Sequence, residues 1–391
     1  TIVRQGGYFG EDTILAQNIP ITAIVTKNAK LGVIKKKDIL SIVNDINRLK
    51  DKTTEESIKD RLDSTVSFTD LKKHRILGCG TFGKVWLVSN KKEKKSVAYA
   101  LKIQVKRELI THHQVEGVMR EKDIMTMLDH PFIIKLINTY QDNEALYMLL
   151  QLVQGGELFT LMHNAKNGVF PEAATKFYAG AILEGLSYMH DRNIVYRDLK
   201  PENTLIDSKG YAVIVDMGFA KIISDKTYTL CGTPLYLAPE VILSRGHDKG
   251  ADQWSWAVMA FEMITGNSPF YEDGMNQIEL FKKITSGTII IPRSLSDEAG
   301  DLITRILKLA PNQRLGSFSG GDTDIKQHGW FENFDFDALI EKRLRSPWRP
   351  NVKDPLDVSM FDNWDHMDTS ERLTPPSAKE QTLFADFGTY I

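Results

Sequence analysis

The stretch Tyr196-Arg197-Asp198-Leu199-Lys200-Pro201-Glu202-Asn203, followed after a gap by Asp216-Met217-Gly218, decides how the rest of the chain is interpreted. Two short apolar runs, Leu205-Ile206 and residues 212–215, lie between these polar segments. The pattern predicts a loop, a hairpin and a second loop. We expect Asp216 to follow a buried strand directly, with Gly218 free to take the conformation of a tight turn.

The polar side chains of this stretch suit the transfer of a phosphoryl group. Asp198 can accept a proton from a hydroxyl group, while Asn203 and Asp216 offer oxygen ligands to a hard cation such as Mg²⁺. Taken singly, Asp, Asn and Lys in loops are more often solvated turn formers. The order and spacing of several such residues favour the functional interpretation.

This order resembles the H-R-D-x-K-x-x-N catalytic loop and the D-F-G motif of protein kinases, with Tyr196 in place of the His and Met217 in place of the Phe. The resemblance implies that Asp198 accepts the substrate proton, Lys200 helps to neutralise the transferred phosphate, and Asn203 with Asp216 binds Mg²⁺. It also implies an α+β, bilobal fold, with a small β-rich lobe and a large helical lobe.

Composition bounds the class of protein. The chain has 391 residues, enough for two or three domains, and 42% hydrophobic with 26% charged residues is typical of a globular protein. The net charge of -2 gives no indication of a nucleic-acid surface, and no apolar run approaches the ~20 residues of a membrane span. Two distant cysteines and no signal peptide favour a cytoplasmic location, and the start at Thr1 suggests a fragment.

The N-terminal segment has a pattern of its own. Residues 1–35 predict short strands, and the helical spacing of apolar residues in 38–49 predicts one amphipathic helix. The segment from Tyr8-Phe9-Gly10-Glu11 to Pro20-Ile21-Thr22-Ala23 resembles the phosphate-binding cassette of cyclic-nucleotide-binding domains. We therefore interpret 1–49 as the C-terminal part of such a domain with its helix, and 50–70 as a linker. Ile21 stands where the family has an Arg, so this copy is expected not to bind a cyclic phosphate; a docking or spacer piece is the alternative.

A glycine-rich run, Gly78-Cys79-Gly80-Thr81-Phe82-Gly83-Lys84-Val85, follows one predicted strand and precedes another. A G-x-G-x-x-G pattern alone could also mark a dinucleotide-binding fold, but there a helix should follow the glycines. The β-rich continuation favours a flap that covers ATP phosphates with its backbone N–H groups.

Two further segments complete the predicted ATP site. Ala100 and Lys102 share a face of the strand at 97–103, and Glu121 lies on the apolar stripe of the next helix, where a carboxylate needs a cation; Lys102 is the expected one. Residues 146–153 resemble the hinge between kinase lobes. The residues assigned to ATP are Leu77, Gly78, Cys79, Gly80, Thr81, Phe82, Gly83, Lys84, Val85, Ala100, Lys102, Glu121, Leu150, Gln151, Val153, Glu157 and Leu205.

The resemblance implies control and specificity elements as well. Thr229 matches an activation-loop phosphothreonine, with Arg197 and Lys221 as its cationic partners, while Gly117 replaces a family His that contacts the phosphate. Arg314 is the expected partner of Glu240. The acids matching those that receive substrate arginines are Glu157, Glu202 and Glu262.

The kinase domain is assigned to residues 71–331 and a C-terminal tail to 332–391. In the tail, Phe361-Asp362-Asn363-Trp364 resembles the segment that reaches the adenine pocket in AGC-group kinases, Thr374-Pro375 the turn motif, and Phe384-Ala385-Asp386-Phe387 the hydrophobic motif.

The whole chain is therefore most similar to AGC-group serine/threonine kinases, in particular those dependent on cGMP, since a cyclic-nucleotide segment precedes the kinase on one chain. This resemblance implies ATP and Mg²⁺ as cofactors, basic protein substrates, and cGMP or cAMP as regulator of the full-length chain. A cAMP-dependent catalytic chain and a pseudokinase scaffold are the alternatives.

Overall fold

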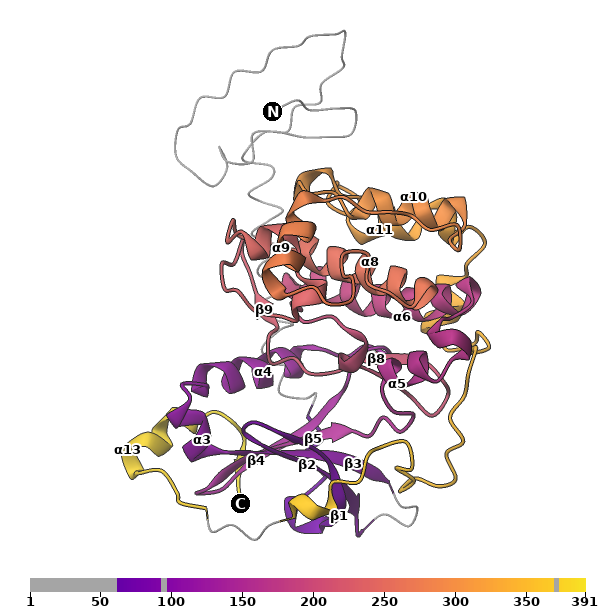
Figure 1. Cartoon of the computed structure of the whole chain (residues 1–391). Coiled ribbons are helices and arrows are strands. Elements are labelled where there is room, and N and C mark those ends of the chain that lie inside the picture. Colours follow the sequence, from indigo (N-terminus) through magenta and orange to yellow (C-terminus); the bar gives the residue numbers. More distant parts are fainter. Residues whose placement is uncertain (1–61, 93–96, 369–372) are drawn as a thin grey trace, which may run out of the picture. The chain divides into compact units, whose positions relative to one another are not determined.

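The computed structural model describes residues 62–92, 97–368 and 373–391. The predicted cyclic-nucleotide segment 1–49 and the first part of the linker lie outside the described residues. From Leu62 onward the chain forms one compact unit, with a β-rich small lobe and a helical large lobe (Figure 1).

The small lobe is a six-stranded sheet with the strand order β1-β2-β3-β5-β4-β10. All neighbours are antiparallel except β10, which pairs with β4 in parallel. The strands are β1 (Leu71–Gly80), β2 (Gly83–Asn90), β3 (Ala98–Val105), β4 (Leu136–Gln141), β5 (Ala145–Gln151) and β10 (Thr389–Tyr390). Helices α3 (Lys106–Thr111) and α4 (Val115–Met127) follow β3 and pack beside the sheet (Figure 1).

The predicted alternation of side chains in β3 is present and gives the sheet two different faces. Tyr99 and Leu101 enter an apolar cluster on one face, with Val66 and Tyr147. Ala100 enters a separate cluster on the face that looks toward the large lobe. Small side chains on that second face leave room for a flat ligand.

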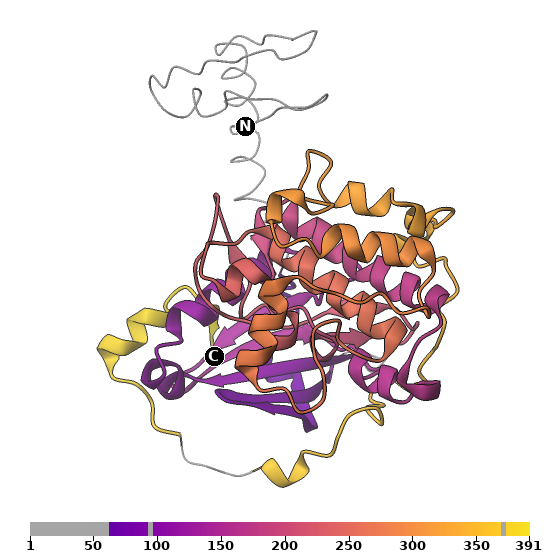
Figure 2. The same ribbon diagram turned by 45° about the horizontal axis from the view of Figure 1, so that its top comes forward.

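The large lobe is built around two long buried helices, α6 (Glu172–His190) and α8 (Lys249–Thr265), which pack on each other. Both are apolar on nearly all sides, which is typical of helices enclosed by other helices. Figure 2 shows α9 and α10 outside them. The other helices are α5 (Leu158–His163), α7 (Pro239–Ile242), α9 (Gln277–Ser286), α10 (Asp297–Ile306), α11 (Asp322–Lys326) and α12 (Phe336–Ile340).

The described residues also form two short two-stranded sheets around the catalytic stretch. β7 (Thr204–Ile206) and β8 (Ala212–Ile214) form the predicted hairpin after the catalytic stretch. β6 (Ile194–Val195) pairs with β9 (Lys221–Ile222), which ties the residues before that stretch to those after Asp216.

Part of the segment assigned to a linker packs on the small lobe. Val66 is 3% exposed, and its carbonyl accepts hydrogen bonds from the Tyr140 hydroxyl at 2.6 Å and the Asn138 amide at 3.3 Å. Residues 62–70 therefore contribute to the core of the small lobe.

The C-terminal tail returns from the large lobe to the small lobe (Figures 1 and 2). Gln154 fixes its first part by donating to the carbonyls of Asp354, Pro355 and Asp357. After α13 (Ala378–Gln381), Phe384 and Phe387 are buried to 0% and 1% exposure. The predicted hydrophobic motif is thus docked against the small lobe.

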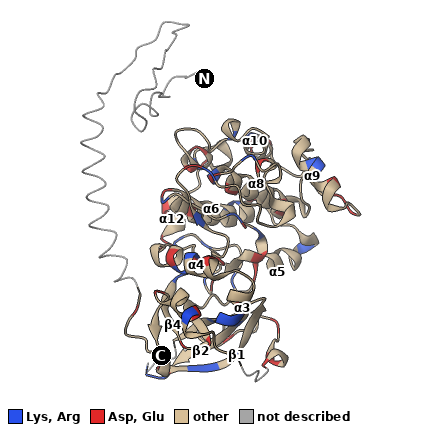
Figure 3. Cartoon of the chain, turned by 90° about the vertical axis from the view of Figure 1, so that its left-hand side faces the viewer, with Lys and Arg blue, Asp and Glu red and all other residues tan. Residues whose placement is uncertain are grey.

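Basic and acidic residues are interspersed along the described part of the chain (Figure 3), in keeping with the small net charge. Within the described part of the chain, no helix combines the length and the apolar character needed to cross a membrane.

Candidate active site

The catalytic stretch holds Asp198 in a network of hydrogen bonds. Its carboxylate is buried and accepts from the Asn203 amide at 2.7 Å and the Thr233 hydroxyl at 3.0 Å. The Lys200 ammonium lies 3.4 Å from the same carboxylate and donates to the Thr233 hydroxyl at 2.9 Å. A carboxylate fixed in this way keeps one orientation, as a proton acceptor requires.

A second aspartate, Asp252 on α8, fixes the backbone of the stretch. Its two oxygens accept from the amides of Tyr196 and Arg197, each at 2.8 Å. His190, at the end of α6, lies between Asp252 and Asp322, at 2.9 and 2.7 Å. Burial lowers the pKa of His190, but the two carboxylates outweigh it and raise the pKa to about 10.

The protonation of His190 predicts a pH dependence of stability. Its pKa is raised above the unfolded value of about 6.5, so its contribution is complete below that pH and is lost as the pH rises toward about 10. We expect the thermal midpoint to fall between pH 7 and pH 10, and to fall less in His190→Gln. Parallel slopes for the two proteins in thermal melts would contradict this.

Asp216 follows β8, as predicted, and the Val215 amide donates to the Asn203 carbonyl at 2.9 Å, which brings the two segments together. Gly218 lies in a tight turn, as expected, which the Ala220 amide closes by donating to the Met217 carbonyl at 3.0 Å. The left-handed residue is Asp216, with φ of +61°, whereas Gly218 does not have a positive φ. The Gly218 amide donates to Asp216 at 3.1 Å, and a Cβ there would lie 3.1 Å from that carboxylate, so a side chain would crowd it.

Lys102 on β3 and Glu121 on α4 form the predicted pair, with 2.6 Å between the ammonium and the carboxylate. Burial lowers the pKa of Lys102, but Glu121 and then Asp216 raise it more, so its pKa is raised. Asp216 is therefore close enough to act on the lysine. The structure thus brings Lys102 near Asp216, the Asp216 segment to Asn203, and Asn203 into contact with Asp198.

The glycine-rich run is the turn between β1 and β2, with no helix after the glycines, which excludes the dinucleotide alternative. A Cβ on Gly78 would meet no protein atom within 4 Å, whereas one on Gly83 would lie 1.7 Å from the Ile103 carbonyl. The protein itself requires Gly83, but it leaves the space beside Gly78 open for a ligand. Lys84 donates to the tail carbonyl of Met367 at 2.6 Å.

Apolar side chains line the space between the flap and the hinge. Leu77, Ala100 and Val358 of the tail form one cluster, joined at its edge by Leu150. The Gln151 amide donates to the Lys135 carbonyl at 2.9 Å, so any contact of Gln151 with a base would use its carbonyl.

Other residues assigned to ATP have different surroundings. The Val153 side chain packs in the core of the large lobe, and Leu205 forms a β-bridge with Glu157. Cys79 is half-buried, Thr81 is exposed, and the Phe82 ring lies 5.5 Å from that of His112.

The side chains present fit a divalent cation and a nucleotide. Asn203 and Asp216 offer hard oxygen ligands, and the open flap and apolar slot suit phosphates and a planar base. Among the described residues, no group of three or more His, Cys, Asp or Glu side chains could hold a metal. A cation here would need phosphate oxygens or water as its remaining ligands.

Among the three predicted arginine-binding acids, Glu202 is close enough to both Glu157 and Glu262 to raise the pKa of each. Burial, then Glu202 and Asp362, raises the pKa of Glu157. Burial and Glu202 likewise raise the pKa of Glu262, whose carboxylate accepts from the Tyr236 hydroxyl at 2.5 Å. This concentration of negative charge favours a cationic partner.

The two predicted cationic partners of a phosphorylated Thr229 make other contacts in the unphosphorylated chain. Lys221 donates to Thr227 at 3.1 Å, while Thr229 is exposed. Arg197 donates to the Phe219 carbonyl, but its Nη1 is buried with no hydrogen-bond partner among the described residues.

Sequence reasoning missed Arg120 on α4, one turn after Gly117. Burial lowers the pKa of Arg197, and the positive charge of Arg120 lowers it further, so the two cations are near each other. The sequence signal that could have indicated Arg120 is its position one helical turn after Gly117, on the same side of the helix.

Comparison with known proteins identifies the described unit. Residues 71–331 match the sequence model of the protein kinase domain. The chain is 39% identical to a human cAMP-dependent protein kinase catalytic subunit, PRKX, over 82% of this chain and 88% of that protein.

Two longer relatives are similar to a comparable degree. Identity is 41% to the cAMP-dependent protein kinase catalytic subunit of Dictyostelium discoideum, over 81% of this chain and 48% of that protein. It is 36% to a cGMP-dependent protein kinase, isozyme 2 (forms cD5/T2), of Drosophila melanogaster, over 93% of this chain and 40% of that protein. The chain spans less than half of each of these two relatives.

Proposed function

Because this chain belongs to the protein kinase family, we propose that it transfers the γ-phosphoryl group of ATP to serine or threonine hydroxyls in basic protein substrates. The observation that carries the proposal is the convergence of Lys102, Asp198, Asn203 and Asp216 from three separate segments: β3, the catalytic stretch and the loop after β8. All four have the chemistry that phosphoryl transfer needs.

Each side chain then has a defined task. Asp198 accepts the proton of the attacking hydroxyl, and Lys200, held 3.4 Å away, offsets the charge that develops beside it. Lys102, oriented by Glu121, would hold the nucleotide phosphates, and Asn203 with Asp216 would hold Mg²⁺. Bound ATP would supply the group to be transferred, and Mg²⁺ would neutralise part of the charge on its oxygens.

The acids around Glu157 predict a preference for arginine. We expect a serine peptide with two arginines before the serine to be a better substrate than its alanine counterpart, because Glu157, Glu202 and Glu262 can pair with guanidinium groups. Glu157→Gln should raise KM for the arginine peptide roughly tenfold and leave KM for the alanine peptide nearly unchanged. Steady-state peptide phosphorylation measures both constants.

Glu332→Gln is the matched control, since Glu332 is an exposed acid elsewhere on the large lobe. It should leave both peptides unaffected. Equal KM values for the two peptides with the unmodified chain would rule out the specificity, although not the transfer itself.

The full-length protein is proposed to depend on cGMP. The alignment with the Drosophila cGMP-dependent relative covers 93% of this chain and leaves 7% uncovered. Residues 1–61 make up more than 7% of the chain, so part of residues 1–61 lies within that alignment. The cassette from Tyr8 to Ala23 supports the same assignment. The cAMP-dependent relatives are similar over the kinase region to an equal degree, so a cAMP-type catalytic chain is the second candidate.

Titration of the complete protein with each nucleotide separates these candidates. We expect cGMP to raise the rate of peptide phosphorylation at lower concentrations than cAMP does. The chain 1–391 alone should not bind either nucleotide, because Ile21 cannot pair with a phosphate. Ile21→Arg should restore measurable binding, and its failure to do so would remove this explanation.

A further inference from the structure

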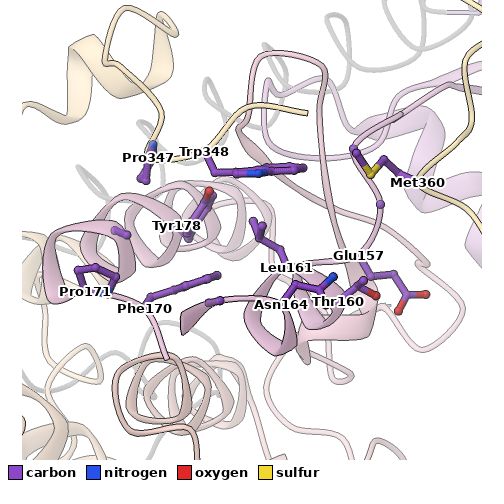
Figure 4. A pocket seen from close by; sticks show the side chains of 14 residues that line it. Glu157, Thr160, Leu161, Asn164, Phe170, Pro171, Tyr178, Pro347, Trp348 and Met360 are labelled. Carbon is purple, nitrogen blue, oxygen red and sulfur yellow. The ribbon is translucent and has the colours of Figure 1, made fainter. Parts of the chain in front are cut away.

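A pocket of about 450 Å³ starts at Gly155-Gly156-Glu157, just after the predicted hinge, and extends between α5, α6 and the tail. The large lobe supplies Leu161 of α5 and Phe170, Ala174 and Tyr178 before and on α6, and the tail supplies Trp348 and Met360. Figure 4 shows the rings of Phe170, Tyr178 and Trp348 toward one end, with Glu157 and Met360 at the other. Its volume is in the range of small-molecule sites.

The walls define the chemistry of an occupant. Aromatic and aliphatic side chains at one end suit a planar apolar body, which can stack on Trp348. At the other end the Glu157 carboxylate lies in the field of Glu202 and Asp362, so a positive charge is favoured there. From this distribution we propose that the pocket binds a planar aromatic amine, with its ring between Leu161 and Trp348 and its ammonium at Glu157.

The pocket shares two elements with the catalytic cleft. The tail residue Met360 packs tightly on Gly156, just after the hinge, since a Cβ on that glycine would lie 3.1 Å from the Met360 carbonyl. Its neighbours Val358 and Phe361 belong to the apolar cluster around Ala100. Under the proposed function, Glu157 also receives a substrate arginine. A bound amine therefore competes with an arginine peptide for Glu157.

Direct binding tests this site without reference to catalysis. The 1–391 chain is saturated with a non-hydrolysable ATP analogue, so that the adenine slot is filled, and titrated calorimetrically with 2-naphthylmethylamine or its neutral isostere 2-naphthylmethanol. We expect the amine to bind roughly tenfold more tightly, and Glu157→Gln to remove that difference. Ala165→Phe, which fills the pocket from its wall, should abolish binding of both compounds.

Three results would overturn the proposal. They are no binding of either compound at millimolar concentration, equal affinities that Glu157→Gln does not alter, and full affinity in Ala165→Phe. If a thermal melt shows Ala165→Phe to be unfolded, Trp348→Ala replaces it and should weaken both compounds. Because no peptide is phosphorylated in this experiment, an inactive kinase and an absent pocket ligand give different results.

Discussion

Asp198→Asn is expected to lower kcat for peptide phosphorylation by about a hundredfold to ten-thousandfold, the usual contribution of a positioned proton acceptor. The amide is nearly the size of the carboxylate, so the contacts with Asn203 and Thr233 can in part persist. It cannot take the hydroxyl proton. KM for ATP should change little, because Lys102 and Asp216 are untouched. Steady-state kinetics with the arginine peptide measure both.

The control is Asp191→Asn, an exposed aspartate just after α6, which should retain the unmodified kcat. The same comparison tests the alternative that the chain is a pseudokinase scaffold. Turnover by Asp198→Asn equal to that of the unmodified chain would mean that this site does not carry the reaction and that the bound nucleotide has another role.

Local patterns in the sequence were sufficient to predict the Lys102–Glu121 pair and the hairpin that leads to Asp216. Helical spacing placed Glu121 on a buried face, where its charge needs a partner, and alternation in the preceding strand put Lys102 on the open face. The hairpin before Asp216 followed from two apolar runs. Each inference used a short segment whose periodicity fixes which side chains share a face.

Contacts between distant segments had no such signal. Gln154 holds carbonyls some two hundred positions later, and Lys84 holds Met367. The positive φ of Asp216 also had no signal in the sequence. A left-handed Asp is uncommon, and glycine is the default expectation there.

Arg314→Met is expected to lower the free energy of unfolding by about 3–5 kcal/mol, the usual cost of leaving one partner of a buried ion pair without the other. Arg314 is 0% exposed and binds both oxygens of Glu240 at 2.6 Å, and it also donates to the carbonyls of Gly250 and Lys308. Its loss leaves a buried carboxylate and orphaned carbonyls. Thermal and chemical denaturation measure the change.

A double-mutant cycle separates the pair from the packing. Glu240→Gln alone should also destabilise, since the Arg314 charge then has no counter-ion, but the double variant should cost less than the sum of the two, because neither partner remains charged and buried. Arg305→Met, in an exposed pair with Asp301 on α10, is the control and should barely shift the midpoint. Strict additivity of the two buried substitutions would mean that Arg314 stabilises the large lobe through the Gly250 and Lys308 carbonyls and through its position over the Trp254 ring, and not through Glu240.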